Sequence, residues 1–287
     1  MTLNITIWDV KQGLAIHIIT PNRKYITIDA GVGSNEDTNF YPLYHLHKKY
    51  GVEKIDYAII THPHKDHIEE IKNLKALSPR VLLRPNHIRK DDLNWEKISD
   101  EDKIIFEEYF DFSDKYALPV SDKENPKLPE NNGGVIIKTF HPKSSPKNNL
   151  NNHSIVTILE YAKSKVLIPG DNEPPSWKEL LAQSEFKEAI KNVDVFVAPH
   201  HGRESSFYQP LFDYFKPKIV IISDGKATNT NASSKYSNIA EGWTVFSRTE
   251  EGLKEKRYCL STRQDGMILI KMGYNSGKKP FLNITKK

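Results

Sequence analysis

The sequence predicts a layered α/β domain in which β-sheets are covered by helices. Short strands rich in isoleucine and valine follow one another near the N-terminus, as in hairpins, and later alternate with helical segments. Hydrophobic residues make up 38% of the 287 residues and charged residues 27%, so the chain is polar but can fold around an apolar core. Hairpins combined with strand–helix units are typical of sheets with helices packed on them.

The N-terminal elements are predicted from β-branched runs, turn residues and helical spacing. Strands rich in isoleucine are expected over residues 3–8, 14–20 and 24–29. A helix is expected over residues 41–50, ended by Gly51, because glycine readily takes the left-handed conformation that closes helices. A buried strand over residues 55–60 and a short strand over residues 81–83 enclose Ile68, Ile71 and Leu74, which lie at helical spacing.

A polar stretch over residues 85–133 interrupts this pattern. It contains an acidic helix candidate over residues 98–112 and a loop rich in proline, asparagine and glutamate over residues 125–133. Long polar segments between core elements are commonly functional loops or lids. We therefore expect one domain over residues 1–287, with an insertion at about residues 85–133 that could act as a lid.

Strands and helices alternate again after the insertion. Strands are expected over residues 135–140, 154–161, 165–168, 193–198 and 218–223. Helices are expected over residues 176–191 and 208–215, and two or three strands over residues 242–272. This order of elements agrees with sheets covered by helices.

Composition excludes several classes of protein. No apolar run approaches the roughly 20 residues of a membrane-spanning helix, and the N-terminus lacks the basic and apolar regions of a secretory signal. The single cysteine, Cys259, excludes an internal disulfide and a multi-cysteine zinc site, so we expect a cytoplasmic protein without membrane association. The formal net charge of +4 permits an anionic substrate but does not mark a dedicated nucleic-acid binder.

The strongest chemical signal is the segment Thr61-His-Pro-His-Lys-Asp-His67, which directly follows the predicted strand over residues 55–60. His62 and His64, two residues apart in an extended segment, point to the same side and can grip one metal ion together. Asp66 and His67 fall at the start of the next helix and can face a second ion. Imidazole and carboxylate ligands together favour Zn²⁺, with Mn²⁺ or Fe²⁺ as alternatives.

This segment resembles the signature of the metallo-β-lactamase superfamily. Further segments resemble the motifs of its competence-type DNA-uptake hydrolase domains and their stand-alone relatives: Asp9-Val-Lys-Gln-Gly-Leu-Ala15, Ile28-Asp-Ala-Gly31, Asn152-His-Ser154 with Pro169-Gly-Asp171, and His200-His-Gly202 with Ser206 and Lys216-Pro-Lys218. The resemblance covers nearly the whole chain outside the insertion. It implies a four-layer αββα sandwich with a one- or two-metal site at the edge where the strands end.

The resemblance also implies roles for residues outside the histidine segment. Asp171 is expected to bridge two metal ions. Of the next pair, His201 is favoured as a metal ligand and His200 as an acid or a phosphate contact. Asp29 is expected to orient a metal-bound histidine, and a turn aspartate is nearly as good an explanation for it. His153 stays open between a further ligand and a capping or surface contact.

These residues lead to a hypothesis about mechanism. Two divalent metal ions, Zn²⁺ first, are expected to share a bridging water with Asp171 and to lower the pKa of that water to about 7, which would yield hydroxide at neutral pH. Asp66 holds metal and is an equally good candidate for orienting the nucleophile. Arg203, Ser205 and Ser206 follow the second histidine pair and could bind phosphate oxygens.

The preferred function is a phosphodiesterase or nuclease acting on nucleic acid, a nucleotide or another phosphodiester substrate, because the competence-type resemblance implies such work. Arg84, Arg89 and Lys90 with Trp95 could form an anion-binding rim, and a solvated charged loop is the commoner explanation of such a run. A thioesterase or lactonase on the same scaffold is the enzymatic alternative. The other alternative is a binding or regulatory protein stabilised by metal. The sequence predicts no particular oligomeric state.

Several positions depart from the motifs of the resembled family. Lys11 and Leu14 replace a glycine and an acidic residue, Glu69-Glu70 stands where a glycine pair is common, and Arg203 replaces a serine. None of these changes removes an expected ligand. They surround the rim of the expected site and therefore bear on substrate identity.

Overall fold

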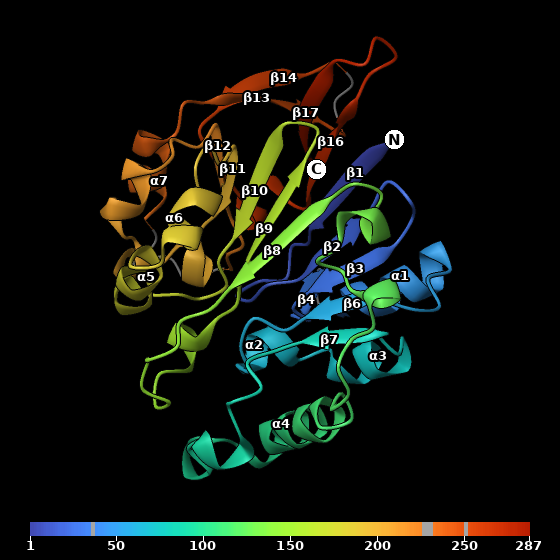
Figure 1. The fold of residues 1–287 in the computed structure, drawn as a ribbon, viewed down its shortest axis with the longest axis vertical. Helices are drawn as coiled ribbons and strands as arrows, with labels where there is room; N and C mark the ends of the chain where they lie inside the picture. The colour runs from blue at the N-terminus through green and yellow to red at the C-terminus, as the bar shows by residue number, and fades with distance from the viewer. Residues whose placement is uncertain (36–37, 226–231, 250–251) are drawn as a thin grey trace.

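Two β-sheets packed face to face form the centre of the structure, and helices cover the outer side of each sheet (Figure 1). The computed structural model describes residues 1–35, 38–225, 232–249 and 252–287. The first sheet has nine strands, in the order β14 (Lys254–Arg257), β13 (Trp243–Ser247), β17 (Pro280–Lys286), β16 (Ile268–Tyr274), β1 (Thr2–Ile7), β2 (Ile16–Ile19), β3 (Tyr25–Ile28), β6 (Tyr57–Ile59) and β7 (Val81–Leu83). The second has six, in the order β15 (Cys259–Ser261), β12 (Ile219–Ile222), β11 (Val195–Val197), β10 (Ser164–Ile168), β9 (Val156–Tyr161) and β8 (Ile136–Phe140). β4 (Gly33–Asn35) and β5 (Thr38–Phe40) form a separate antiparallel pair.

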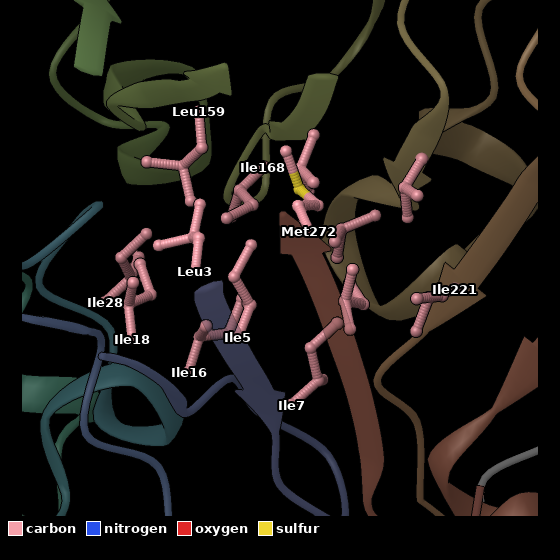
Figure 2. Close-up of a cluster of buried hydrophobic side chains, with 14 of the residues drawn as sticks. Leu3, Ile5, Ile7, Ile16, Ile18, Ile28, Leu159, Ile168, Ile221 and Met272 are labelled. Atoms are coloured by element: carbon pink, nitrogen blue, oxygen red, sulfur yellow. The ribbon is translucent and has the colours of Figure 1, made fainter. Parts of the chain in front are cut away.

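Alternate residues of the strands fill the space between the sheets. Leu3, Ile5 and Ile7 of β1 are fully buried, while the residues between them are partly exposed. They belong to one buried cluster with Leu159 of β9 and Ile168 of β10, which approach from the second sheet (Figure 2). Side chains alternate between the faces of a strand, so each strand contributes every second residue to this core.

The central strands of the second sheet are apolar on both faces. In β12, Ile219 and Ile221 belong to the core between the sheets, while Val220 and Ile222 pack in the cluster beneath the helices. A strand buried on both sides is a continuous apolar run, as is common in parallel sheets. β10, β11 and β12 are indeed paired in parallel.

Helices complete the four layers. On the first sheet lie α1 (Pro42–Tyr50), α2 (Lys65–Ile68), α3 (Ile71–Ala76) and α4 (Asp100–Ser113), of which α4 packs on α2 and α3. On the second lie α5 (Pro174–Leu181), α6 (Ser184–Ala189) and α7 (Ser233–Ile239), and α8 (Thr262–Asp265) follows β15. The predicted αββα sandwich is therefore confirmed. In the described part of the chain, no helix is both long and apolar enough to cross a membrane.

The predicted helix over residues 176–191 is wrong in one respect, because the structure divides it into α5 and α6. Trp177 and Phe186 are both fully buried, yet nine residues at 100° each would place them on opposite sides of one straight helix. Gln183, in an extended conformation between the two helices, lets both rings face the sheet. Packing of two aromatic rings thus outweighs the continuity of a helix.

The C-terminal half differs from expectation in three further places. Residues 242–272 contain four strands, β13 to β16, instead of two or three, and β17 follows them. The helix expected over residues 208–215 is a short 3-10 helix, Gln209–Asp213. β17 was not predicted because Pro280, Asn283 and Lys286 are residue types that are uncommon in strands, and its extended form depends on pairing with β16 and β13.

Parallel strands direct the loops that carry the expected ligands to one edge of the sandwich. β3 is parallel to β6 in the first sheet, and β10, β11 and β12 are parallel in the second. Asp29, the histidine segment, Asp171 and the His200-His201 pair each follow the carboxyl end of one of these strands. Carboxyl ends of parallel strands meet at one edge of a sheet, which brings these distant segments together.

One prediction concerns His17 of β2, which is buried and stacks on Tyr25 with ring centroids 5.7 Å apart. Burial lowers the pKa of His17 from 6.5 to about 4. Between pH 6.5 and about 4, His17 is protonated in the unfolded chain and neutral in the folded chain. The free energy of unfolding should therefore fall by about 2–3 kcal/mol as the pH drops from 7 to 4.5. In His17→Phe that part of the fall should vanish, as measured by urea unfolding at both pH values. The exposed residue His47 supplies the control, His47→Phe, and an equal effect of both substitutions would contradict the assignment.

Candidate metal centre

The histidine segment begins at the carboxyl end of β6 and leads into α2. His62 is fully buried, and its Nε2 lies 2.9 Å from Nδ1 of His64. His64 has an extended backbone, with φ −88° and ψ 152°, so two rings that are two residues apart converge from the same side. The structure therefore brings together the two imidazoles that the sequence predicts for one metal ion.

A second group of ligand atoms lies beside this pair. His201 Nε2 lies 3.3 Å from both Asp66 Oδ2 and Asp171 Oδ2, and His67 Nε2 lies 3.4 Å from Asp171 Oδ1. Ligand atoms of Asp66, His67 and His201 all lie within 4.8 Å of one another, and so do those of His62, His67 and Asp171. His67 thus belongs to both groups, and Asp171 contacts members of both.

The chemistry of these donors fits divalent cations. Nε2 of His67 and Nε2 of His201 are buried and lie 3.3–3.4 Å from carboxylate oxygens, but they make no well-formed hydrogen bond among the described residues. A buried polar atom without a partner is costly, and a metal ion is a natural partner for an imidazole nitrogen. A set of imidazoles and carboxylates in a tight cluster suits Zn²⁺ in particular.

Asp29 and Thr61 orient two of the imidazoles from behind. The Asp29 carboxylate accepts hydrogen bonds of 2.7 Å from both the backbone N–H and the hydroxyl of Thr61, and its Oδ2 lies 2.7 Å from Nδ1 of His67. Nδ1 of His67 therefore donates, which leaves Nε2 for a metal. Because the Thr61 hydroxyl donates to Asp29, Nδ1 of His62 is the donor in its 3.2 Å contact with that hydroxyl. Nε2 of His62 therefore carries no proton and can ligate a metal.

Ser154 connects the histidine segment with the Asp171 loop. Its Oγ lies 3.2 Å from Nδ1 of His62 and accepts a 3.0 Å hydrogen bond from the backbone N–H of Asp171. Gly170 precedes Asp171 with a φ of +62°, and a Cβ at this position would lie 2.8 Å from Cβ of Ser154. Only glycine combines this conformation with so close an approach.

The second histidine pair lies on a strained turn after β11. His200, His201 and Gly202 have φ values of 48°, 56° and 71°, so three successive residues are left-handed. This conformation costs a non-glycine residue roughly 1–2 kcal/mol and is retained where surrounding contacts demand it. Nδ1 of His201 lies 3.1 Å from the carbonyl oxygen of Ser223, which fixes the ring with Nε2 toward Asp66 and Asp171.

His200 lies at the border of the cluster. Its Nε2 is 3.9 Å from Oδ2 of Asp171, while its Nδ1 is 3.2 Å from Oγ of Ser206 and 3.4 Å from Oε1 of Glu173. The ring is therefore held through Nδ1, and Nε2 faces the centre. Of the two histidines, His201 belongs to a group of candidate ligand atoms and His200 does not.

Close charges counteract burial in the cluster. Burial alone would raise the pKa of Asp171, but His201 and His67 hold it well below its usual value. Burial alone would lower the pKa of His201, but the charge of Asp171 raises it to about 9. Burial and the neighbouring histidines lower the pKa of His62 well below 6.5, so this ring is neutral and ready to bind metal at pH 7.

His153 does not join the cluster. Its Nδ1 lies 2.8 Å from Nε2 of His87, and its Nε2 lies 3.2 Å from the carbonyl oxygen of Pro146. Both ring nitrogens therefore have partners outside the centre. Of the two alternatives left open by the sequence, the structure favours a local contact over a ligand.

The residues expected to bind phosphate take different positions. Arg203 is partly exposed and Ser205 is exposed, next to the His200 turn. Ser206 is fully buried with its Oγ on His200, so it supports that ring and does not face solvent. The sequence does not reveal that Ser206 is buried, because its burial depends on residues that are distant along the chain.

The expected anion-binding rim is largely neutralised. Arg89 lies 3.6 Å from Asp114, and Lys90 lies 2.9 Å from Glu107 with its Nζ over the ring of Trp95. These pairs favour the explanation of a charged, solvated surface. Arg84 differs from them, since its side chain is partly buried and its hydrogen bonds go to Ser113 and Tyr116.

Sequence reasoning missed Glu173. Its carboxylate accepts hydrogen bonds from the side-chain amides of Asn149, Asn151 and Asn152, at 2.8, 3.4 and 3.4 Å, and lies beside His200. The only signal in the sequence was its position two residues after Asp171. The three asparagines that hold it precede it by more than 20 residues, so a local pattern does not reveal the contact.

Comparisons with known proteins agree with this geometry. The family model described as "Metallo-beta-lactamase superfamily" matches residues 10–223. ComE operon protein 3 of Bacillus subtilis is 23% identical over 185 residues, which are 61% of this chain and 21% of that protein. Recombination protein 2 of Haemophilus influenzae is 30% identical over 76 residues, 26% of this chain and 9% of that protein. The chain thus spans about a fifth and about a tenth of these relatives.

One solved structure is distantly similar. Zn²⁺-bound PqqB from Methylobacterium extorquens superposes with a TM-score of 0.43 and 10% identity, covering 77% of this chain and 89% of that chain. The sequence motifs and the family match agree with one another, so the resemblance stated from the motifs is confirmed.

Asp29 provides a test of how the ligands are oriented. Asp29→Asn removes the negative charge beside Nδ1 of His67 and replaces one of the two acceptor oxygens with an NH2 donor, so Thr61 and His67 cannot both keep their acceptors and we expect the affinity for Zn²⁺ to fall by about 10- to 100-fold. A competition titration with a chromogenic chelator measures this affinity. The matched control is Asp9→Asn, a carboxylate outside the cluster, which should bind Zn²⁺ as the wild type does. Unchanged affinity in Asp29→Asn would show that His67 needs no such partner.

Proposed function

Since the chain belongs to the metallo-beta-lactamase superfamily of metal-dependent hydrolases, we propose that it cleaves phosphodiester bonds at a site holding two divalent metal ions. The observation that carries the proposal is the position of Asp171. Its carboxylate lies 3.9 Å from Nε2 of His62, 3.4 Å from Nε2 of His67 and 3.3 Å from Nε2 of His201. A carboxylate between two groups of ligand atoms suits a bridging role.

Each ion has its own proposed ligand set. One set is His62, His64 and Asp171, and the other is Asp66, His67, His201 and Asp171. Zn²⁺ is the preferred occupant for these donors, with Mn²⁺ or Fe²⁺ as alternatives. When bound, the ions supply Lewis acidity and lower the pKa of water at the site.

His200 is proposed to donate a proton to the leaving group. Ser206 and Glu173 hold its Nδ1 and leave its Nε2 facing the centre, 3.9 Å from Asp171. Burial lowers the pKa of His200, so the ring is largely neutral at pH 7 in the free protein. An anionic substrate favours its protonated form, which makes the donor available when it is needed.

A phosphodiester suits the mouth of the site better than an acyl ester does. Arg203 borders the His200 turn and makes no ion pair among the described residues. A thioesterase or lactonase needs an apolar acyl pocket, whereas the lining of the cavity beside the insertion includes the cations Arg84 and Lys127 as well as apolar residues. One relative bears the name Recombination protein 2, and a nucleic-acid substrate agrees with that name.

Hydrolysis of a chromogenic diester tests the proposal. Protein loaded with Zn²⁺ or Mn²⁺ should release p-nitrophenol from bis-p-nitrophenyl phosphate faster than from p-nitrophenyl acetate. Chelation, or the double substitution His62→Ala and His64→Ala, should reduce the rate by more than about a hundredfold, because loss of ligands affects metal binding more than loss of their supports.

His45 and His47 of α1 form a matched control, since they are also two residues apart. The double substitution His45→Ala and His47→Ala should leave the rate unchanged. Activity on the acyl ester alone would favour the thioesterase or lactonase alternative. A metal-replete protein inert on both esters would favour a binding protein.

The leaving group distinguishes the two roles considered for His200. His200→Asn keeps a residue that tolerates a left-handed φ and removes the proton donor. We expect kcat on a thymidine dinucleotide to fall by about a hundredfold or more, while bis-p-nitrophenyl phosphate is little affected, because p-nitrophenolate leaves without a proton. Equal losses on both substrates would assign His200 to phosphate binding instead.

A further inference from the structure

A cavity of about 290 Å³ lies beside the candidate metal centre, between the ends of β7 and β8. These are edge strands of the two sheets (Figure 1). The polar part of the lining is formed by Arg84, Asn86, His87, Lys127, Thr139 and His141. Ile155, in the apolar wall, donates its backbone N–H to the carbonyl of Thr61 at 3.0 Å and follows Ser154, whose Oγ contacts His62. The cavity and the centre therefore share a wall.

Arg84 is a fixed cation that makes no ion pair with a carboxylate of the described residues. Its Nε and Nη2 donate to the hydroxyl and the carbonyl of Ser113 and to the carbonyl of Tyr116, at 2.7, 2.8 and 3.1 Å. Carbonyls at the end of α4 balance only part of a full charge. Nη1 has no hydrogen-bond partner in the described part of the chain, so the guanidinium is held in place with two donors to spare.

Lys127 adds a second unpaired charge to the lining. Neither Lys127 nor Arg84 makes an ion pair among the residues that the structure describes. Arg89 and Lys90 on the same insertion are, by contrast, paired with Asp114 and Glu107. Two cations without counter-ions at one cavity favour an anionic ligand.

The imidazoles of the cavity offer the opposite chemistry. A carbonyl only accepts, so Nε2 of His153 donates to Pro146, and its Nδ1 accepts from Nε2 of His87. By the same logic, Nδ1 of His141 donates to the carbonyl of Pro142 at 3.0 Å. Burial lowers the pKa of His87, which keeps it neutral at pH 7 with Nδ1 as an acceptor, and His141 has Nε2 as its second ring nitrogen.

Unpaired cations next to imidazole acceptors suit a ligand that has both negative charge and hydrogen-bond donors. A nucleotide supplies phosphate oxygens together with sugar hydroxyl or base N–H groups, whereas inorganic phosphate supplies mainly acceptors. We infer that this cavity binds the nucleotide next to the scissile phosphodiester, with its phosphate on Arg84 and Lys127 and its donors on His87 and His141. The inference rests on the proposed function and narrows its substrates to chains of at least two nucleotides.

Two measurements test the cavity. Arg84→Met and Lys127→Met remove each charge and keep an unbranched side chain. We expect each to weaken binding of fluorescein-labelled pentathymidylate to the metal-free protein by about tenfold, and to raise KM similarly for a 5′-phosphorylated thymidine dinucleotide, which has a phosphate besides the scissile one, through loss of a charge-assisted contact. The kcat/KM for bis-p-nitrophenyl phosphate should stay within about twofold, because that substrate has no second nucleotide.

Arg89→Met is the matched control, since it removes an ion-paired arginine from the same insertion. It should leave both measurements unchanged. An effect equal to that of Arg84→Met would show that any positive charge in this region strengthens binding, and would overturn the inference. Thymidine monophosphate should displace the labelled strand better than inorganic phosphate does. Equal competition would overturn the assignment of a nucleotide.

The binding measurement separates this inference from the proposed function. Binding that depends on Arg84 and Lys127, in a protein that cleaves no phosphodiester, would support the cavity and refute hydrolysis. Cleavage of the dinucleotide with wild-type KM in both variants would support hydrolysis and overturn the cavity. Arg84 also anchors Ser113 and Tyr116, so Lys127→Met carries the test if Arg84→Met melts at a lower temperature.

Discussion

The carboxylate of Asp171 is the group on which the arrangement of the centre depends. Its oxygens lie between 3.3 and 3.9 Å from the Nε2 atoms of His62, His67, His200 and His201. A buried carboxylate needs positive partners, because removal from water costs several kcal/mol that only close charges or hydrogen bonds can offset. Protonated His67 and His201, or bound metal cations, can supply this positive charge. The buried carboxylate of Asp171 therefore favours binding of a cation at the centre.

The ligand-bearing loops keep this arrangement because hydrogen bonds between them restrict their movement. Ser223 donates its hydroxyl to the carbonyl of Gly13 at 2.8 Å, and the backbone N–H of His200 donates to the carbonyl of Gly170 at 3.2 Å. Such contacts tie loops from both sheets to each other. Three successive left-handed residues persist only where neighbours over-determine them, and here they separate the direction of the His201 ring from that of His200.

The sequence predicted features that depend on neighbouring residues better than contacts between residues far apart along the chain. The ligand cluster could be predicted because its residues lie in short motifs at strand ends, and parallel strands deliver such ends to one edge. The break between α5 and α6 could also have been predicted, from the phase of Trp177 and Phe186 along a helix. The contacts of Glu173 with the asparagines and of His153 with His87 could not be predicted, because contacts between loops more than 20 residues apart leave no periodic pattern in the sequence.

The insertion shows why a run of like charges cannot be interpreted without the surfaces opposite it. Arg84, Arg89 and Lys90 are similar in sequence, yet Arg89 and Lys90 are paired with Asp114 and Glu107, whereas the hydrogen bonds of Arg84 go to neutral oxygens of Ser113 and Tyr116. The same contacts of Arg84 tie the end of α4 to the end of β7, and α4 also packs on α2 and α3. This packing favours a fixed wall over a hinged lid. A fixed wall presents its unpaired charge in one place, which is what recognition of a second nucleotide requires.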